Sequence, residues 1–186
     1  MTDRRRDLIR LLTEYRPEDS GERVARLEML DLAAAAADPF DRSDHHPGHF
    51  TASAFVLHPS GVRVLVVYHR KIQAWLQPGG HIEPDDASMV AAAEREVTEE
   101  TGVGGLRPLI PGVCDVDVHA VPAVGEPAHR HYDVRFAFVA ADARIRVSSE
   151  VEEVRWVTLA DLDDLGADRS VMRPVERLLG PILSEQ

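Results

Sequence analysis

The sequence has almost no cysteine and no long apolar run, and these two shortages exclude several classes of protein. Cys114 is the single cysteine among the 186 residues, so neither an internal disulfide nor a thiolate metal site can form. It lies in an apolar, strand-like run, which predicts a buried structural thiol rather than a nucleophile. No apolar run is long enough for a signal peptide or a membrane span. We therefore expect a cytoplasmic protein with no membrane partner.

Positive charge is also scarce. Lysine and arginine total 21 against 32 aspartate and glutamate residues, which gives a net charge of -11. This balance argues against binding of a nucleic-acid polymer, because such binding needs a basic face. It is compatible with a small phosphorylated substrate, because bound metal ions can invert the local field. Carboxylates that hold such metals would themselves add to the negative total.

The chain is long enough for one domain with an extra element. Residues 4–15 and a segment that Ser20 can cap carry apolar side chains at helical spacing; the second stripe comprises Val24, Leu27, Leu30 and Leu32. A looser stretch over 38–48, rich in Pro, Asp and His, follows them. We therefore predict a helical N-terminal extension over 1–47 and a main domain over 48–186. Packing is the favoured role of the extension, with a lid or the arm of a homodimer as alternatives.

The main domain mixes strands and helices without regular alternation, which predicts a mixed sheet rather than a doubly wound parallel one. Apolar runs bounded by turn residues predict strands over 51–57, 62–68, 75–77, 113–121, 132–140 and 154–157. The first two are expected to pair as a hairpin. Trp75 could stack on a base, but packing in the core is the favoured interpretation. Helices are predicted from Asp85 or Asp86 to about Thr101 with Gly102 as the stop, over 159–165, and over 171–179 with Pro174 in the first turn.

Three glutamates crowd the first of these helices. Glu96, Glu99 and Glu100 stand at i, i+3 and i+4, so they share one arc beside the apolar stripe of the helix. Like charges at this spacing repel each other and destabilise a bare helix. A hard divalent cation accounts for the crowding, because Mg²⁺ prefers oxygen ligands. A solvated acidic face is the simpler alternative.

The residues around the glutamates favour the metal site. Gly79 and Gly80 precede the helix, and glycines let the backbone approach a ligand and expose a carbonyl to a metal. Arg95 adjoins the cluster and can pair with Glu99 or with a carboxylate of the loop. Pairing of surface charges would account for Arg95 equally well.

These residues resemble a known motif. The segment from Gly80 to Val103 is similar to the Nudix box: a glycine, an acidic residue, then Arg-Glu-x-x-Glu-Glu-x-Gly and an apolar residue. The resemblance covers roughly residues 48–165 and implies an α+β fold, the Nudix-type α/β/α sandwich with a central mixed β-sheet. One feature departs from the motif. Counting back from Arg95 places Ala87 where a glutamate is expected, so the loop is one residue longer and Asp86 becomes the substitute, either in that role or as a helix cap.

The resemblance implies an enzyme that uses Mg²⁺ or Mn²⁺ to hydrolyse a phosphoanhydride bond in a nucleoside diphosphate linked to another group. It implies that Glu96, Glu99 and Glu100 bind the metal with the Gly79 carbonyl. The general base would be Glu99, Glu100 or a carboxylate of a later loop that precedes the tryptophan-bearing strand. The candidates in that loop are Glu150, which is favoured, and Glu152 and Glu153.

The substrate is harder to predict. Four side chains could meet phosphate or a base: Arg70, His129, His131 and Arg135. His129 and His131 would share one face of a strand. Such a His-x-His pair can also suggest zinc, but no third ligand is evident, and His45, His46 and His49 have no spacing that requires a metal. A solvent-facing strand is an equally good interpretation of these residues.

Two other functions fit the same fold. An isomerase resembling those that act on isopentenyl diphosphate would need a catalytic cysteine and a more degenerate box, whereas Cys114 is the only cysteine and the box is well formed. A ligand-binding regulator would be expected to lose a box glutamate, and all three are present. Hydrolysis therefore ranks first. A nucleoside triphosphate, ADP-ribose, a nucleotide sugar, a dinucleoside polyphosphate and a prenyl diphosphate remain open as substrates.

Overall fold

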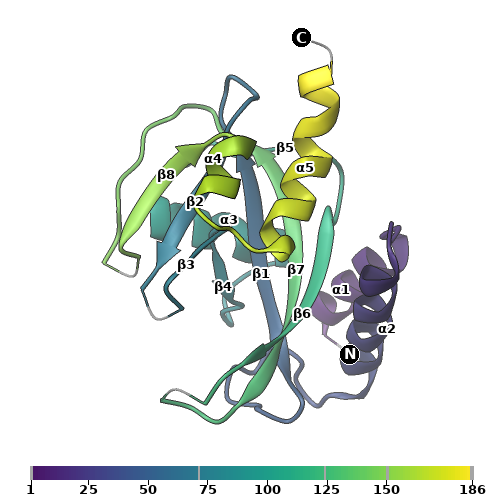
Figure 1. Cartoon of the computed structure of the whole chain (residues 1–186). Coiled ribbons are helices and arrows are strands. Elements are labelled where there is room, and N and C mark those ends of the chain that lie inside the picture. The colour runs from purple at the N-terminus through teal and green to yellow at the C-terminus, as the bar shows by residue number, and fades with distance from the viewer. Residues whose placement is uncertain (1, 71, 124, 150, 185–186) are drawn as a thin grey trace.

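A computed structural model describes residues 2–70, 72–123, 125–149 and 151–184, and it places one mixed sheet between helices (Figure 1). The strands follow the order β3-β2-β1-β7-β5, with β4 paired to β1, β6 to β7 and β8 to β2. Their bounds are β1 Gly48–Leu57, β2 Val64–His69, β3 Ala74–Leu76, β4 Gly79–His81, β5 Arg107–Pro108, β6 Asp115–Val121, β7 His129–Val139 and β8 Glu153–Val157. The helices are α1 Asp3–Glu14, α2 Ser20–Ala35, α3 Met89–Thr101, α4 Leu159–Asp164 and α5 Arg169–Ser184.

The mixed character of the sheet comes from its centre. Strands β1 and β7 pair in parallel, from Gly48 opposite Arg130 to Leu57 opposite Val139, and the other pairings are antiparallel. The predicted mixed sheet and the predicted hairpin of the first two strands are confirmed. Because side chains alternate along a strand, the even-numbered residues of β1 and β7 face one layer and the odd-numbered residues face the other.

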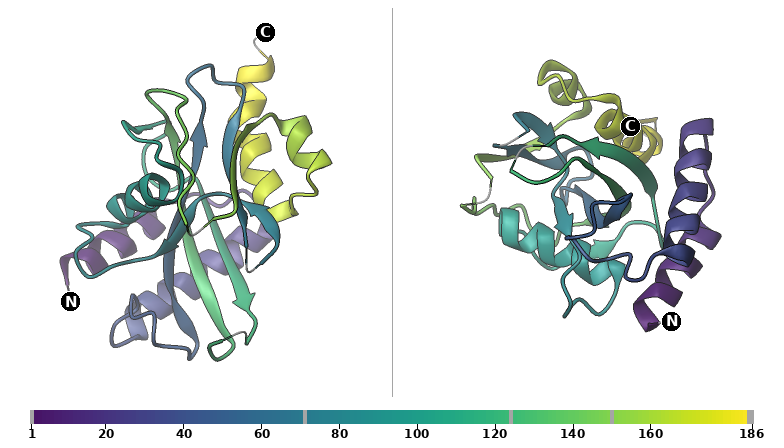
Figure 2. Two further views of the ribbon diagram at one scale, coloured as in Figure 1. Left: turned by 90° about the vertical axis from the view of Figure 1, so that its left-hand side faces the viewer. Right: turned by 90° about the horizontal axis from the view of Figure 1, so that it is seen from below.

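Helices lie on both sides of the sheet (Figure 2), and an apolar core fills the space between sheet and helices on each side. The larger core joins even-numbered residues of β1 and β7 to α1, α2 and α3. The smaller core joins the upper part of the sheet to α4 and α5, and it contains Cys114 and Trp75, so their predicted burial is confirmed. The two N-terminal helices contribute Leu8, Leu12 and Met29 to the larger core, so they share it with the strands. The boundary between an extension and a main domain stays a prediction.

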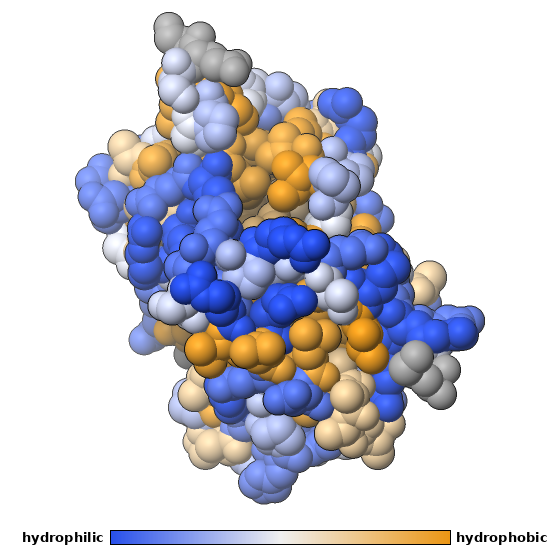
Figure 3. All heavy atoms as spheres, turned by 90° about the vertical axis from the view of Figure 1, so that its right-hand side faces the viewer, coloured by the Kyte–Doolittle hydropathy of each residue, from blue (hydrophilic) through white to orange (hydrophobic). Residues whose placement is uncertain are grey.

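The predicted apolar stripe of α2 is wrong in part. Val24 and Leu27 are 57% and 59% exposed, whereas Ala25 and Met29 are buried. Figure 3 views the side on which α2 lies and shows a band of apolar side chains across it. The apolar pattern predicted the wrong buried face for the first half of α2. In that half the helix turns a carboxylate, Glu22, inward toward arginines of α5. A homodimer with the N-terminal extension as its arm stays a prediction.

The predicted ends of two helices also need correction. Ser88, rather than Asp85 or Asp86, caps α3 by accepting a hydrogen bond from the Ala91 amide, and Gly102 ends the helix with a φ of 69° as expected. Helix α5 begins at Arg169, so Pro174 lies in its second turn rather than its first.

No helix among the residues that the structure describes is long and apolar enough to cross a membrane.

Candidate active site

The glycines of β4 bring backbone and carboxylates together. A Cβ atom on Gly79 would lie 2.2 Å from the Cβ of Ser53 on the neighbouring strand, and one on Gly80 would lie 2.8 Å from the Glu96 carboxylate. A side chain at position 79 would clash with the backbone of β1, and one at position 80 would displace the Glu96 carboxylate. In the space so left, the Gly79 amide donates a 3.0 Å hydrogen bond to Glu100 Oε2. The strand therefore lies directly against the acidic face of α3.

The three glutamates of α3 line one cleft. Glu96 and Glu100 are 8% and 6% exposed, whereas the Glu99 side chain is 51% exposed. All three border a cleft of about 670 Å³, together with Gly79 and Gly80. The helix buries its apolar stripe against β1, and this docking holds the neighbouring glutamates at the cleft. The structure therefore brings together every residue that the box motif predicted for the metal.

Arg95 fixes the position of the acidic residues. Its guanidinium donates to both oxygens of Asp86, at 3.0 and 2.9 Å, and to Glu96 and Glu99, each at 2.9 Å. A fifth hydrogen bond, of 2.9 Å, reaches the His81 carbonyl. Burial alone would raise the pKa of Asp86, but hydrogen bonds from Arg95 and the Glu83 amide outweigh it and hold the pKa below its ordinary value. Asp86 thus binds Arg95 and does not cap the helix.

The donor set fits a hard divalent cation. Arg95 binds three carboxylates, those of Asp86, Glu96 and Glu99, whereas Glu100 accepts a hydrogen bond from the Gly79 amide. The oxygens offered are carboxylates, which suit Mg²⁺ and Mn²⁺ better than nitrogen or sulfur ligands do. Two of the glutamates are nearly buried, so bringing a cation to them offsets a costly concentration of negative charge.

The other predicted site residues are divided between the cleft and the interior. Arg70 and His131 line the cleft, whereas His129 is buried beside it. Glu150 lies outside the described residues, although its neighbour Ser149 lines the cleft.

Arg135 is not placed to contact a substrate. The side chain is 2% exposed, and its guanidinium is bound by three aspartates, Asp115, Asp117 and Asp133. A further contact, of 2.7 Å, goes to the Ser170 carbonyl. That carbonyl precedes Pro174 by four residues, and proline has no amide hydrogen to donate to it. Arg135 therefore supplies a donor to the Ser170 carbonyl in place of the missing amide of Pro174.

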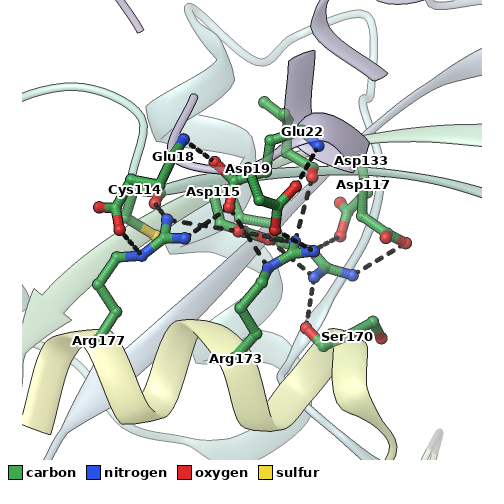
Figure 4. A network of polar contacts seen from close by, with 12 residues as sticks. Glu18, Asp19, Glu22, Cys114, Asp115, Asp117, Asp133, Ser170, Arg173 and Arg177 are labelled. Atoms are coloured by element: carbon green, nitrogen blue, oxygen red, sulfur yellow. Dashed lines mark hydrogen bonds and ion pairs between the residues drawn. The ribbon is translucent and has the colours of Figure 1, made fainter. Parts of the chain in front are cut away.

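Arg135 shares Asp115 with Arg173, and through it joins a polar network that ties α2 to α5 (Figure 4). Arg173 of α5 binds Asp115 at 2.8 Å and Glu22 of α2 at 3.4 Å. Arg177 binds Glu22 at 2.5 Å. Burial raises the pKa of Asp115 to about 6, although the neighbouring arginines act in the opposite direction.

Several cleft residues were missed from the sequence. His81 and His119 line the cleft, as do Asp133 of β7 and Arg42 of the segment that follows α2. Burial lowers the pKa of His81 to about 4 and that of His131 to about 2, so both imidazoles are neutral at pH 7. No sequence signal pointed to Arg42. His81 directly follows the two glycines, so its position could have been predicted to lie at the site.

Comparisons with known proteins agree with this geometry. The model of the NUDIX domain matches residues 47–179, and no curated protein matches the chain in sequence. A Nudix-family hydrolase from Clostridium perfringens is 22% identical, with a TM-score of 0.56 over 72% of this chain and 97% of that one. The dihydroneopterin triphosphate pyrophosphohydrolase of E. coli is 18% identical, with a TM-score of 0.56 over 71% and 95%. The NUDIX domain of Shewanella oneidensis NrtR, solved with ADP ribose, is 17% identical, with a TM-score of 0.57 over 98% and 99%. At these identities the three structures show the fold.

Proposed function

The chain belongs to the Nudix hydrolase family, and on this premise we propose that it hydrolyses a phosphoanhydride bond in a nucleoside diphosphate linked to another group, with Mg²⁺ or Mn²⁺ as cofactor. The observation that carries the proposal is the convergence of Glu96, Glu99 and Glu100 with the Gly79-Gly80 backbone on one cleft. A regulator without catalysis would not need to hold three carboxylates in this way.

Each box residue has a role in this proposal. Glu96, Glu99, Glu100 and the Gly79 carbonyl hold the metal, and Arg95 orients Glu96 and Glu99 through its 2.9 Å hydrogen bonds. When bound, the metal neutralises charge on the pyrophosphate and lowers the pKa of a bound water. The protein contributes pre-placed carboxylates, which need little rearrangement when the substrate arrives.

One carboxylate takes the proton of the attacking water. Glu99, Glu100 and Glu150 are the candidates, because a general base has to come within hydrogen-bond reach of that water. Glu153 is less suited, since it forms a 2.6 Å hydrogen bond with Arg155 on the edge strand β8. Glu152, the remaining residue of that loop, is exposed.

The substrate enters a polar cleft with arginines at its wall. Arg70 and Arg42 can bind phosphate oxygens, and His131 can donate a hydrogen bond as a neutral imidazole. Arg135 is left out of the substrate contacts because its guanidinium is already bound. A cytoplasmic location and the absence of a nucleic-acid partner stay predictions from the sequence.

The test is release of phosphate and pyrophosphate from a panel of substrates with Mg²⁺ or Mn²⁺, for wild type and Glu99→Gln. The panel takes its members from the similar structures: ADP-ribose, a diadenosine tetraphosphate and dihydroneopterin triphosphate, with nucleoside triphosphates and nucleotide sugars. We expect metal-dependent turnover that falls at least about 100-fold in the variant, or about 2.7 kcal/mol of barrier. Turnover that Glu99→Gln leaves unchanged would show that the site is misassigned.

The alternative is a regulator that binds its ligand without cleaving it, and the NrtR domain, solved with ADP ribose, aligns over nearly the whole chain. The same panel separates the two functions. A folded protein that binds ADP-ribose and turns over none of the panel would favour the regulator. The isomerase alternative is disfavoured, because Cys114 is 5% exposed and burial raises the pKa of its thiol.

A further inference from the structure

Strand pairing gathers histidines that are far apart in the sequence. His49 of β1 pairs with His131 of β7, and His131 also pairs with His119 of β6. Directly paired residues point to the same face of a sheet, and so does His129, two residues before His131. The third histidine that the His-x-His pair lacked in the sequence is therefore supplied by another strand.

The nitrogen atoms of three histidines are close enough to bind one ion. The ligand atoms of His49, His129 and His131 all lie within 4.8 Å of one another, and the Nε2 atoms of His129 and His131 are 3.2 Å apart. A tetrahedral zinc ion with Zn–N bonds of about 2.0–2.1 Å separates its nitrogen ligands by roughly 3.4 Å. One pair already has about this spacing, and binding of one ion would draw the third histidine closer.

Hydrogen bonds to backbone carbonyls orient two of the rings for this purpose. The Nδ1 atoms of His49 and His129 lie 3.1 Å from the Asp44 carbonyl and 2.9 Å from the Pro127 carbonyl. A carbonyl oxygen only accepts, so Nδ1 carries the proton and Nε2 keeps its lone pair. Histidines that bind metals usually have this outer hydrogen bond.

The buried Nε2 of His49 points to a missing partner. The ring of His49 is wholly buried, and its Nε2 has no hydrogen-bond partner among the residues that the structure describes. A buried polar atom without a partner is costly and rare in folded proteins. An ion held between His49 and the other two histidines would supply that partner.

We propose that His49, His129 and His131 form a zinc site distinct from the carboxylate site of α3. Three imidazoles suit Zn²⁺ and bind Mg²⁺ poorly, so the two sites select different metals. His45, Glu126 and His129 are also close enough to hold an ion. This set is the weaker candidate, because the exposed Glu126 already lies 3.8 Å from His45.

The zinc site adjoins the cleft. His131 lines the cleft, and the ring of His81, which also lines it, is centred 5.1 Å from the ring of His49. Three protein ligands leave the fourth position of a tetrahedral ion for water or a phosphate oxygen. The site is thus placed to bind an anionic group of a ligand in the cleft.

The first measurement is the zinc content of the untagged protein after loading with ZnCl2 and dialysis in excess Mg²⁺, read by elemental mass spectrometry. We expect one zinc ion per chain. Glu99→Gln should retain it, because the carboxylate site does not hold this ion. Loss of zinc in Glu99→Gln, or displacement by Mg²⁺, would place the ion at α3 and overturn the proposal.

Ligand variants locate the ion. His49→Gln and His131→Gln should weaken zinc binding, in competition with a chelating dye, by more than the roughly 10- to 100-fold typical for a group that only orients a ligand. His58→Gln is the matched control: His58 follows β1 at its opposite end, about 30 Å away at the rise of an extended strand. The zinc affinity of the His58→Gln variant should equal that of wild type.

Folding is checked by circular dichroism, since His49 is wholly buried. If His49→Gln does not fold, the half-buried His131 provides the variant that decides, and Co²⁺ absorption of the wild type reports nitrogen ligation directly. Absence of zinc in the wild type would overturn the proposal. So would retained binding in both ligand variants, or loss in Glu126→Gln with retention in His49→Gln.

Discussion

The substitution Glu22→Gln tests how the N-terminal helices are held. Glu22 is fully buried, and one carboxylate oxygen accepts from Arg177 at 2.5 Å (Figure 4). The other oxygen accepts from the Tyr15 hydroxyl at 2.7 Å and the Glu18 amide at 2.8 Å. Glutamine keeps the shape but has one acceptor oxygen. Its amide group must then face either Arg177 or the two other donors.

The expected loss of folding free energy follows from the burial of the Glu22–Arg177 ion pair. Removing one partner of a buried ion pair costs about 3–5 kcal/mol of folding free energy. Arg177 is 22% exposed, so water screens part of that loss and about 2–4 kcal/mol remains. For a chain of this size, each kcal/mol lowers the Tm by roughly 2–4 °C. We expect the free energy of unfolding, measured in urea by circular dichroism at pH 7, to fall by this amount.

The control is Glu18→Gln. Glu18 also contacts Arg177, at 3.1 Å, but its side chain is 62% exposed. An exposed pair contributes no more than about 1 kcal/mol. Equal losses of unfolding free energy in the two variants would refute the reasoning, because burial would then have no effect.

Acid provides a second check. Burial alone would raise the pKa of Glu22, but hydrogen bonds from Arg177 and Tyr15 outweigh it and hold the pKa below its ordinary value of 4.5. A carboxyl group with a lowered pKa stabilises the fold fully above the ordinary value and loses that contribution as the pH falls through the folded value. The stability gap between wild type and Glu22→Gln should therefore narrow below pH 4.5.

Two further changes address the cleft. In Asp86→Asn, Arg95 loses its bidentate acceptor, a charge-assisted contact that contributes about 1.5–3 kcal/mol. We expect kcat to fall roughly 10- to 150-fold and the Mg²⁺ concentration for half-maximal rate to rise. An unchanged Mg²⁺ requirement would reduce Asp86 to a purely structural role. In Gly79→Ala, the new methyl group would lie 2.2 Å from the Ser53 Cβ, and we expect the free energy of unfolding in urea to fall by about 1–3 kcal/mol. Gly104→Ala is the control, because Gly104 has open space around it and its variant should unfold like wild type.

The main elements of the fold were predictable because their signals are local. Alternating and continuous apolar runs predicted the strands, and Gly102 marked the end of α3. The buried face of α2 was not predictable. It depends on Glu22 meeting Arg177, which lies 155 residues further along the chain. Apolar periodicity has no information about such a partner, so Val24 and Leu27 were expected inside and are exposed.

The site likewise combines residues that are close in the sequence with residues that are far apart in it. Glu96, Glu99 and Glu100 lie within five residues of one another on one helix, so their convergence is a property of helical spacing. The histidines come from different strands. Placing His49 beside His131 requires the parallel register of β1 and β7, and a shift of one residue would turn one of them to the opposite face.

The odd-numbered residues of β1 and β7 change from polar to apolar along the strands, and the cleft ends at this change. On β1 this face begins with polar residues and continues with apolar ones: His49, Thr51 and Ser53, then Phe55 and Leu57. On β7 it runs from histidine and aspartate through Arg135 to Ala137. The apolar half lies in the core formed with α4 and α5, whereas Thr51, Ser53, His131 and Asp133 of the polar half line the cleft. Arg135 stands at the border and donates to the Ser170 carbonyl in the first turn of α5. The arginine that the sequence suggested for a substrate therefore holds the start of the helix that covers the apolar half, and the polar half beyond it is left to the cleft.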